Sequence, residues 1–284
     1  MITNIHLNSS SIIEQLLDFF YSFISEENCR ICERVMLARG QLLEGLQDFG
    51  EEARPAIIHR WVDNIPRYSR VICSDCWQGL SSEPPLMGFY EHDGERSFAI
   101  VSGAPYIGEM RSLIHSLKYE GDRLLAPDLA AIMLNGWRMG SIFLNQRNAV
   151  LVPVPLHWRK GMERGFNQAE LLANEASKVL GIPVLRGALT RCRATTPQQS
   201  LEKAERFKNV ENAFHGNPSK LMGRAVILVD DVCTSGATLA ECAREANRCG
   251  ATKVVALTVA RTMLRGGHNS SINQLRQEQK ESDH

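Results

Sequence analysis

Residues 225–238 read Ala-Val-Ile-Leu-Val-Asp-Asp-Val-Cys-Thr-Ser-Gly-Ala-Thr, an apolar run followed by two acids and a loop of small residues. The run from Val226 to Val229 is short and continuously apolar, which predicts a strand buried on both faces of a parallel sheet. Adjacent strand residues point to opposite faces, so Asp230 and Asp231 can serve one site only where the chain leaves the strand. We therefore expect both acids at the carboxyl edge of an open α/β sheet, where such sheets bind ligands.

The loop after the acids suits an anion. Gly236 allows close approach to the backbone, and a helical pattern begins at Leu239. Free N–H groups and roughly half a positive charge at the helix N-terminus would face the loop. We interpret Cys233 as a small filler, with a nucleophilic thiol as the alternative. The predicted phosphate cradle consists of Val232, Cys233, Thr234, Ser235, Gly236, Ala237 and Thr238.

The order of these pieces narrows the class of ligand. The P-loop spacing with its Lys is absent, and no G-x-G-x-x-G opens a helix, so neither an NTPase nor a dinucleotide site is supported. Carboxylates accept hydrogen bonds from sugar hydroxyls, which indicates a sugar phosphate, with Mg²⁺ screening further phosphates. The stretch resembles the 5-phosphoribosyl-1-pyrophosphate (PRPP) signature of type I phosphoribosyltransferases. A buried strand that ends in an acidic turn without a ligand is the alternative.

Composition sets broad limits on the protein. With 284 residues, 44% of them hydrophobic, the chain can bury a full core and form one or two domains. The formal net charge of zero gives no support for long-range attraction to nucleic acid or an anionic membrane, although a local patch stays open. No apolar run reaches the ~18 residues of a membrane span, and no Lys or Arg precedes Arg30. We expect a cytoplasmic protein without a membrane partner.

Four of the eight cysteines form two C-x-x-C pairs, and two such pairs can complete a tetrahedral Zn²⁺ site. Residues 33–72 separate the pairs, far more than the ~15 to 20 residues of a compact zinc ribbon, so we expect an inserted helical excursion between them. A closed site of four thiolates would be structural. Two redox pairs or unligated thiols are the alternatives. The predicted ligands are Cys29, Cys32, Cys73 and Cys76.

Three regions are expected along the chain. Residues 1–88 form a helical, four-cysteine zinc module, in which 9–24 is an amphipathic helix and 81–88 reads as a linker. We expect that helix to pack on its own domain, with a partner helix or a membrane surface as alternatives. Residues 89–264 form the sugar-phosphate domain. Residues 265–284 are polar and are expected to be a disordered tail.

The apolar run from Ala149 to Val154 predicts a second buried strand, which must stop at Pro153 and Pro155 because proline cannot donate to a ladder. The basic loop after it leads to a helix that ends near Leu180, with Asn167 and Glu170 placed as a capping box. Basic groups on such a loop suit a pyrophosphate leaving group, and a solvated surface loop is the alternative. The predicted pyrophosphate-loop residues are Leu156, His157 and Arg164.

The polarity and period of further segments predict their structure and role. Lys118 is interpreted as part of a solvated turn, with a role near pyrophosphate as the alternative. After the acidic strand we expect a helix over about 239–248, an αL cap at Gly250 and a strand over 253–260. Residues 189–209 are polar and basic, which is typical of a lid. Its predicted residues are Arg191, Arg193, Thr195, Gln198 and Arg206.

Together these motifs identify the chain as similar to the ComF family of phosphoribosyltransferase-like proteins over about 106–261. The motifs are Leu117-Lys118-Tyr119, Pro153-Val154-Pro155-Leu156-His157, Arg164-Gly165-Phe166-Asn167-Gln168, the 191–209 segment, residues 229–238 and the cysteine pairs. The resemblance implies a type I phosphoribosyltransferase core, a zinc-binding N-terminal module and, in some members, handling of imported DNA. The long insertion and the Thr234-Ser235 pair, where Thr-Thr is more usual, depart from the pattern.

Three functions fit these observations. An enzyme would displace pyrophosphate from C1 of PRPP with a nitrogen nucleophile, with Asp230 and Asp231 as the catalytic acids that hold the ribose. A sensor would bind PRPP or a nucleotide without turnover. A DNA-uptake accessory would dock DNA or a protein of the competence machinery, such as a helicase, through the zinc module. The acceptor and the oligomeric state are left open, with a dimer as one alternative.

Overall fold

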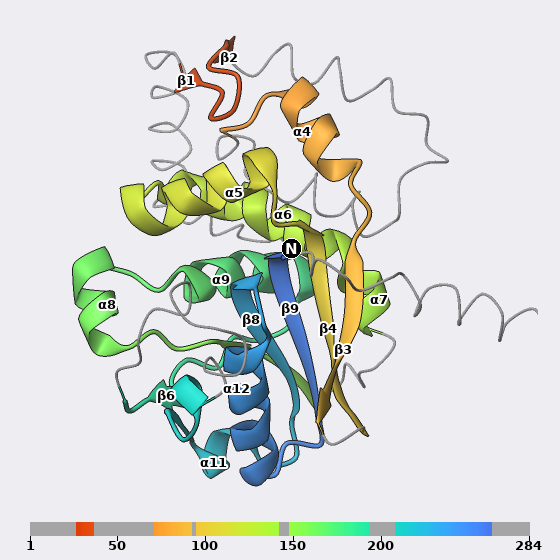
Figure 1. Ribbon diagram of the computed structural model, residues 1–284, viewed down its shortest axis with the longest axis vertical. Helices are drawn as coiled ribbons and strands as arrows, with labels where there is room; N and C mark the ends of the chain where they lie inside the picture. Colours follow the sequence, from red (N-terminus) through yellow and green to blue (C-terminus); the bar gives the residue numbers. More distant parts are fainter. Residues whose placement is uncertain (1–26, 37–70, 93–94, 142–147, 194–207, 263–284) are drawn as a thin grey trace, which may run out of the picture. The chain divides into compact units, whose positions relative to one another are not determined.

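The computed structural model describes residues 27–36, 71–92, 95–141, 148–193 and 208–262 (Figure 1). The chain divides into two compact units, residues 1–80 and 81–284, which are described here one at a time. The predicted helix at 9–24, most of the 33–72 insertion and the 265–284 tail lie outside the described residues.

The smaller unit has three short elements in its described part. Strands β1 (Glu27–Asn28) and β2 (Val35–Met36) pair antiparallel, and helix α4 spans Ser74–Ser81. The turn between β1 and β2 carries the first cysteine pair, and the second pair lies at the start of α4. The first pair therefore sits on a tight turn and the second on the first turn of a helix.

The larger unit is built on a five-stranded sheet with the strand order β3-β4-β9-β8-β5. Strands β4, β9, β8 and β5 run parallel, which confirms the predicted α/β class with a parallel sheet. Strand β3 adds an antiparallel edge. The strand bounds are Leu86–His92 for β3, Glu95–Pro105 for β4, Ala149–Pro153 for β5, Ala225–Cys233 for β8 and Lys253–Arg261 for β9.

The β3–β4 hairpin was not predicted. Leu86 to Gly88, expected to be linker, pair with residues 100–102 of β4 and so belong to the sheet. Only the segment between the end of α4 and Leu86, with its two prolines, connects the units. A second, two-stranded sheet pairs β6 (Leu189–Arg191) with β7 (Phe214–Gly216).

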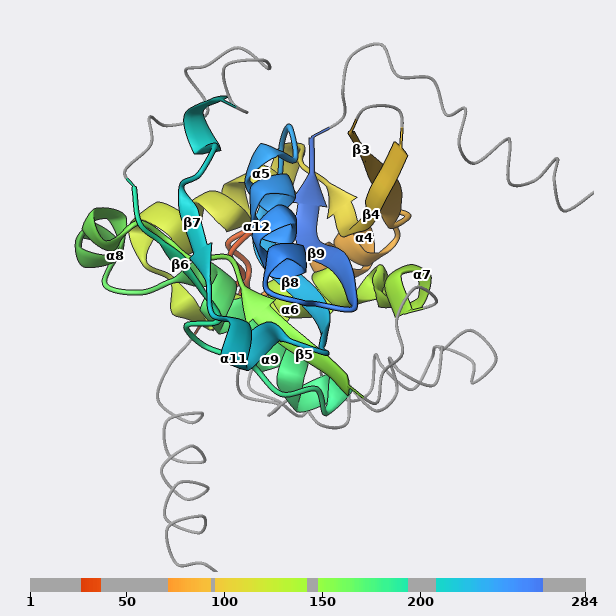
Figure 2. The same cartoon turned by 90° about the horizontal axis from the view of Figure 1, so that it is seen from below.

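Helices cover both faces of the large sheet. Helices α6, α7 and α9 pack against one face, and α12 with the β6–β7 sheet covers the other (Figure 2). Within the described residues no helix has the length and apolar character needed to cross a membrane. The bounds are Gly108–His115 (α5), Ser116–Glu120 (the π-helix η2), Arg123–Leu125 (the 3₁₀-helix η3), Ala126–Asn135 (α6), Trp137–Ser141 (α7), Trp158–Arg164 (α8), Gln168–Leu180 (α9), Pro218–Leu221 (α11) and Ala237–Arg248 (α12).

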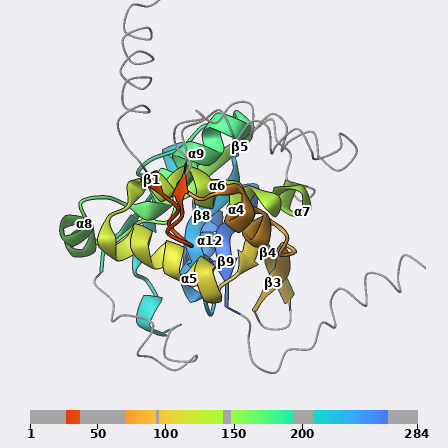
Figure 3. The ribbon, with the colours of Figure 1, turned by 90° about the horizontal axis from the view of Figure 1, so that it is seen from above.

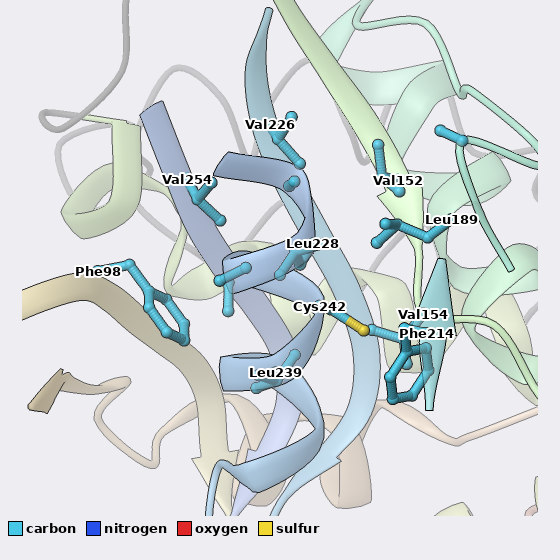
Figure 4. Close-up of a cluster of buried hydrophobic side chains, with 14 of the residues drawn as sticks. Phe98, Val152, Val154, Leu189, Phe214, Val226, Leu228, Leu239, Cys242 and Val254 are labelled. Carbon is cyan, nitrogen blue, oxygen red and sulfur yellow. The ribbon is translucent and has the colours of Figure 1, made fainter. Parts of the chain in front are cut away.

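Strand β8 lies at the centre of this core. Val226 and Leu228 pack in one hydrophobic cluster with Leu239 and Cys242 of α12 (Figure 4). The alternate residues of the strand, Ile227 and Val229, are also fully buried and point to the opposite face. Burial of the strand on both faces is therefore confirmed.

The predicted end of the strand at Val229 is wrong. Strand β8 continues to Cys233, because β9 runs on to Arg261 and offers pairing partners to Asp230, Val232 and Cys233. The alternation of side chains therefore extends through the acids, and Asp230 and Asp231 point to opposite faces of the sheet.

The predicted helix ends are confirmed in part. Asn167 caps α9 by accepting the N–H of Ala169 at 3.0 Å, as expected. The carboxylate of Glu170 pairs with Arg186 instead of closing a capping box. Gly250 has a φ of 84°, so the αL conformation predicted after α12 is present. Local sequence predicted these helix ends. The contact made by the Glu170 carboxylate depends instead on Arg186, which lies farther along the chain.

Candidate functional site

The side chain of Asp231 points to the face that holds Lys118. Lys118 Nζ lies 2.7 Å from Asp231 Oδ1, and both side chains are largely buried, with 17% and 4% of their surfaces exposed. The other oxygen, Asp231 Oδ2, is buried without a hydrogen-bond partner in the described structure. The interpretation of Lys118 as part of a solvated turn is therefore wrong.

Local backbone geometry explains where Lys118 lies. Helix α5 runs directly into the π-helix η2, which ends at Gly121 with a φ of 73°. Within this widened turn the Lys118 side chain is largely buried, whereas its neighbour Tyr119 is 57% exposed. Burial acts to lower the pKa of Lys118, but the charges of Asp231 and Asp230 outweigh it and raise the pKa. The lysine is therefore a buried cation.

Asp230 has different surroundings on the other face. Its Oδ1 accepts the backbone N–H of Asp231 at 2.9 Å. Burial, followed by the charge of Asp231, raises the pKa of Asp230 to about 7, against the opposing charges of Lys118 and Arg191. Arg191 is at the end of β6, with its guanidinium 5.2 Å from the ring centre of Phe214. The structure thus brings the predicted lid arginine close enough to influence this acid.

The predicted cradle connects β8 to α12. Gly236 is the N-cap of α12, with a φ of 80°, and Ser235 Oγ accepts the N–H of Ala237 at 3.4 Å. Thr262 holds the start of the loop, because its hydroxyl donates to the carbonyl of Thr234 and its N–H to that of Cys233. The loop therefore stands at the N-terminus of a 12-residue helix, on the face toward which Asp230 points.

A basic residue near this loop was missed by sequence reasoning. Arg261 ends β9 directly beside Cys233, and its charge acts on the pKa of that thiol. The guanidinium fills space left by Gly88, where an added Cβ would lie 2.2 Å from Arg261 Nη1. Burial, the largest cause, raises the pKa of Cys233 to about 11. The thiol is thus protonated at neutral pH, in keeping with a filler.

The basic loop after β5 is joined to the segment that carries Lys118. Arg164, the last residue of α8, lies 4.9 Å from the ring centre of Tyr119. A second contact runs from the Lys118 segment to the basic loop. Arg123 lies 4.6 Å from the ring centre of Phe166 and donates to the carbonyl of Gly165. Helix α8 lies beside the end of α5 (Figure 3). The predicted pyrophosphate loop and Lys118 therefore belong to one region, in which Leu156 is partly buried and His157 is buried.

The predicted lid is described only at its two ends. Arg193 donates to the carbonyls of Asn209 and Glu211, at 3.1 and 2.7 Å, which joins the ends of the segment. Thr195, Gln198 and Arg206 lie outside the described residues.

The two cysteine pairs come together in the smaller unit. The sulfur atoms of Cys29, Cys32, Cys73 and Cys76 all lie within 4.8 Å of one another, and those of Cys32 and Cys73 are 3.7 Å apart. Four thiolates around a tetrahedral zinc, each at about 2.3 Å, would be about 3.8 Å from one another. Burial acts to raise the pKa of Cys29, but backbone N–H donors, first that of Cys73, hold it near 6. The arrangement fits Zn²⁺.

Curated relatives match between about half and two thirds of the chain. DNA utilization protein YhgH of Escherichia coli (strain K12) is 35% identical over 168 residues, which are 58% of this chain and 72% of that protein. Competence protein F of Haemophilus influenzae is 31% identical over 209 residues, 67% of this chain and 90% of that protein. Competence protein ComFC of Bacillus subtilis is 31% identical over 49% of this chain and 54% of that protein. No family profile matches the chain.

Two solved structures are similar at low scores. Glutamine PRPP amidotransferase from B. subtilis, complexed with ADP and GMP, superposes on 46% of this chain and 29% of its own, with 18% identity and a TM-score of 0.29. A structure of the allosteric regulatory enzyme of purine biosynthesis superposes on 54% of this chain and 32% of its own, with 18% identity and a TM-score of 0.32. The fold assignment therefore rests on the strand order and helix placement of the chain itself.

Proposed function

The chain belongs to the ComF family, and from this membership we propose that its larger unit binds PRPP or a related sugar phosphate at the carboxyl edge of the sheet. We propose further that it transfers the phosphoribosyl group to a nitrogen acceptor. None of the eight cysteines is in a disulfide, which suits the reducing cytoplasm that belongs to this proposal.

The observation that carries the proposal is the junction of β8 and α12. The loop 234–238 supports binding of the 5-phosphate, because it offers N–H groups at the start of a helix. Asp230, on the same face, supports recognition of ribose hydroxyls, since a carboxylate accepts hydrogen bonds. Arg191 supplies a positive charge near that acid. Asp230 thus suits the sugar of the ligand, the loop 234–238 suits its phosphate, and Arg191 suits its negative charge.

The proposed reaction needs little chemistry from the protein. The nitrogen lone pair attacks C1 of the ribose, the bond from C1 to the pyrophosphate oxygen breaks with its electrons leaving on pyrophosphate, and the acceptor nitrogen loses a proton. Positioning and charge stabilisation supply the rate. Asp230 fixes the ribose side, Asp231 holds Lys118 on the opposite face, and the region of Lys118 and Arg164 stabilises the leaving group. In this proposal Mg²⁺ arrives with the pyrophosphate.

Pyrophosphate release tests the enzyme directly. The protein is incubated with PRPP and Mg²⁺ and with a panel of nucleobases and amines, and release is compared with a variant in which both Asp230 and Asp231 are Asn. We expect release that depends on an acceptor and is lost in the variant. Binding of PRPP by the wild type without release under any acceptor would favour the sensor instead, and absence of both would reject the site.

The relatives' names favour a second candidate. Two of them are named for competence and one for DNA utilization, which supports a role in DNA uptake. For this role we propose docking of DNA or of a competence protein by the zinc unit. Gel-shift assays with single- and double-stranded DNA, using the wild type and a Cys76→Ser variant, test it. If the two proteins bind DNA equally well, or if neither binds it, docking of DNA by the zinc unit is rejected.

A further inference from the structure

The buried pair of Lys118 and Asp231 has more donors and acceptors than its own contact uses. Lys118 Nζ has three N–H donors, and the described structure gives it one partner, Asp231 Oδ1 at 2.7 Å. Asp231 Oδ2 is left without a donor although it is buried. A pair that served packing alone would be expected to satisfy its polar atoms, because unpaired buried polar groups cost stability.

The charges around the pair are unequal. Lys118 contacts Asp231, and its charge also acts on Asp230, on which the charge of Arg191 acts as well. Two acids brought into a partly dry site require positive charge nearby, or one must take up a proton. In many oxygen-rich sites a divalent ion supplies that charge. Here the ammonium group of Lys118 already supplies positive charge, in contact with Asp231.

The acids do not fit a resident divalent ion. Mg²⁺ needs near-octahedral oxygen ligands at about 2.0–2.1 Å. Asp231 Oδ1 is in contact with Lys118, and Asp230 Oδ1 accepts a backbone N–H. Among the described residues the groups that could hold a metal are the four cysteines, and neither acid belongs to such a cluster.

We infer that Lys118 is the resident counter-ion of Asp231 and a positioning residue of the site, and that a ribose phosphate binds there without a divalent ion. The inference rests on the proposed function, because it concerns the same site. The two N–H donors of Lys118 that Asp231 does not use would serve the oxygens of the ligand. A pyrophosphate group could still bring its own Mg²⁺.

Calorimetric titration with ribose 5-phosphate tests this inference, because that probe has no pyrophosphate to carry metal. The wild type, Lys118→Met, Lys118→Arg and the exposed control Lys178→Met are each titrated in EDTA and in Mg²⁺. For the wild type and Lys178→Met we expect affinities that differ less than about threefold between the two conditions. Lys118→Met should lose about 10- to 100-fold in EDTA, the range for a lost charge-assisted hydrogen bond, and regain part of it in Mg²⁺. Lys118→Arg should keep metal-independent binding.

The outcomes separate this inference from the proposed function. Binding by the wild type in Mg²⁺ but not in EDTA would overturn the inference and leave the sugar-phosphate site standing. Unchanged binding by Lys118→Met would also overturn it. Failure of the wild type to bind in either condition would reject the site itself. If Lys118→Met does not fold, Lys118→Met combined with Asp231→Asn removes both charges of the buried pair together, and should fold but bind weakly.

Discussion

At the scale of single residues, Asp230 should make stability depend on pH. Its folded pKa of about 7 lies above the ~3.9 of an unfolded Asp, so the native state holds the proton more tightly. The resulting stabilisation is fully present below about pH 4 and is lost as pH rises to about 7. Asp230→Asn mimics the protonated form and should be more stable than the wild type at pH 8, with the difference shrinking toward pH 4.

Urea denaturation of both proteins between pH 4 and pH 8 measures this difference. The exposed Glu109→Gln serves as the control and should follow the wild type across the range. A constant gap between Asp230→Asn and the wild type at all pH values would show that Asp230 is not the titrating group.

Cys233 gives a second prediction at this scale. The thiol is 2% exposed, and burial raises its pKa to about 11, so it should be inert. At pH 7 iodoacetamide should label the exposed Cys192 well before Cys233, as read by peptide mass spectrometry. Cys233→Ser should bind ribose 5-phosphate as the wild type does. Lost binding with an intact fold would show that the sulfur itself contacts the ligand.

At the scale of elements, α12 holds the small β6–β7 sheet through buried acids. Glu245 accepts the N–H of Gly216 at 2.9 Å, and Glu241 accepts that of Asn212 at 2.6 Å. Each acid also pairs with an arginine one turn later on α12. The buried acids, rather than the exposed arginines, should therefore carry the stability of this junction.

Two substitutions in one ion pair separate these contributions. Glu245→Ala removes a 5% exposed acceptor and leaves the N–H of Gly216 unpaired, which should cost about 1–3 kcal/mol. Arg248→Ala removes the 58% exposed partner and should cost at most about 1 kcal/mol. Urea midpoints at pH 7 measure both. Equal losses would mean that the ion pair, and not the bond to Gly216, holds the junction.

The same scale shows what sequence could predict. The apolar runs of β5, β8 and β9 and the period of α9 and α12 are local signals, and each of these elements was expected. The end of β8 depends on β9, and the pairing of β3 depends on β4, so neither could be seen in a local pattern. Gly88 illustrates the limit of prediction from local sequence. A side chain there would collide with the guanidinium of Arg261, a residue far away in the sequence.

The candidate site also has a part that local sequence predicts and a part that depends on tertiary packing. Its cradle and acids lie within residues 230–238, so one stretch of sequence indicated them. Lys118 reaches Asp231 from a distant part of the chain through a π-helix, a rare turn that polarity and period do not reveal. Polar residues around a glycine suggested a solvated turn, and the burial of the lysine followed from tertiary packing.

At the scale of the whole molecule, removal of bound zinc should destabilise the smaller unit and not the larger one. The four clustered cysteines all belong to residues 1–80, and none contributes to the large sheet. Metal analysis should find about one zinc per chain by the four-ligand rule, lost in Cys76→Ser and kept in Cys192→Ser. Chelation should unfold residues 1–80 while the melting of the sheet domain stays unchanged. A chain without zinc, or a Cys76→Ser variant that keeps it, would contradict the assignment.

The cysteine cluster also makes a place where new sequence can be grafted. The sulfurs of Cys32 and Cys73 are 3.7 Å apart, and the N–H of Arg30 donates to the carbonyl of Val71 at 2.9 Å. The chain that leaves after Met36 thus returns at Val71 to the cluster from which it set out. The entropic cost of joining two fixed points by a flexible connection rises only slowly with the length of that connection. A fluorescent domain whose own termini are adjacent could therefore be inserted between Met36 and Val71. Its fluorescence would then report whether the four-cysteine cluster holds its metal.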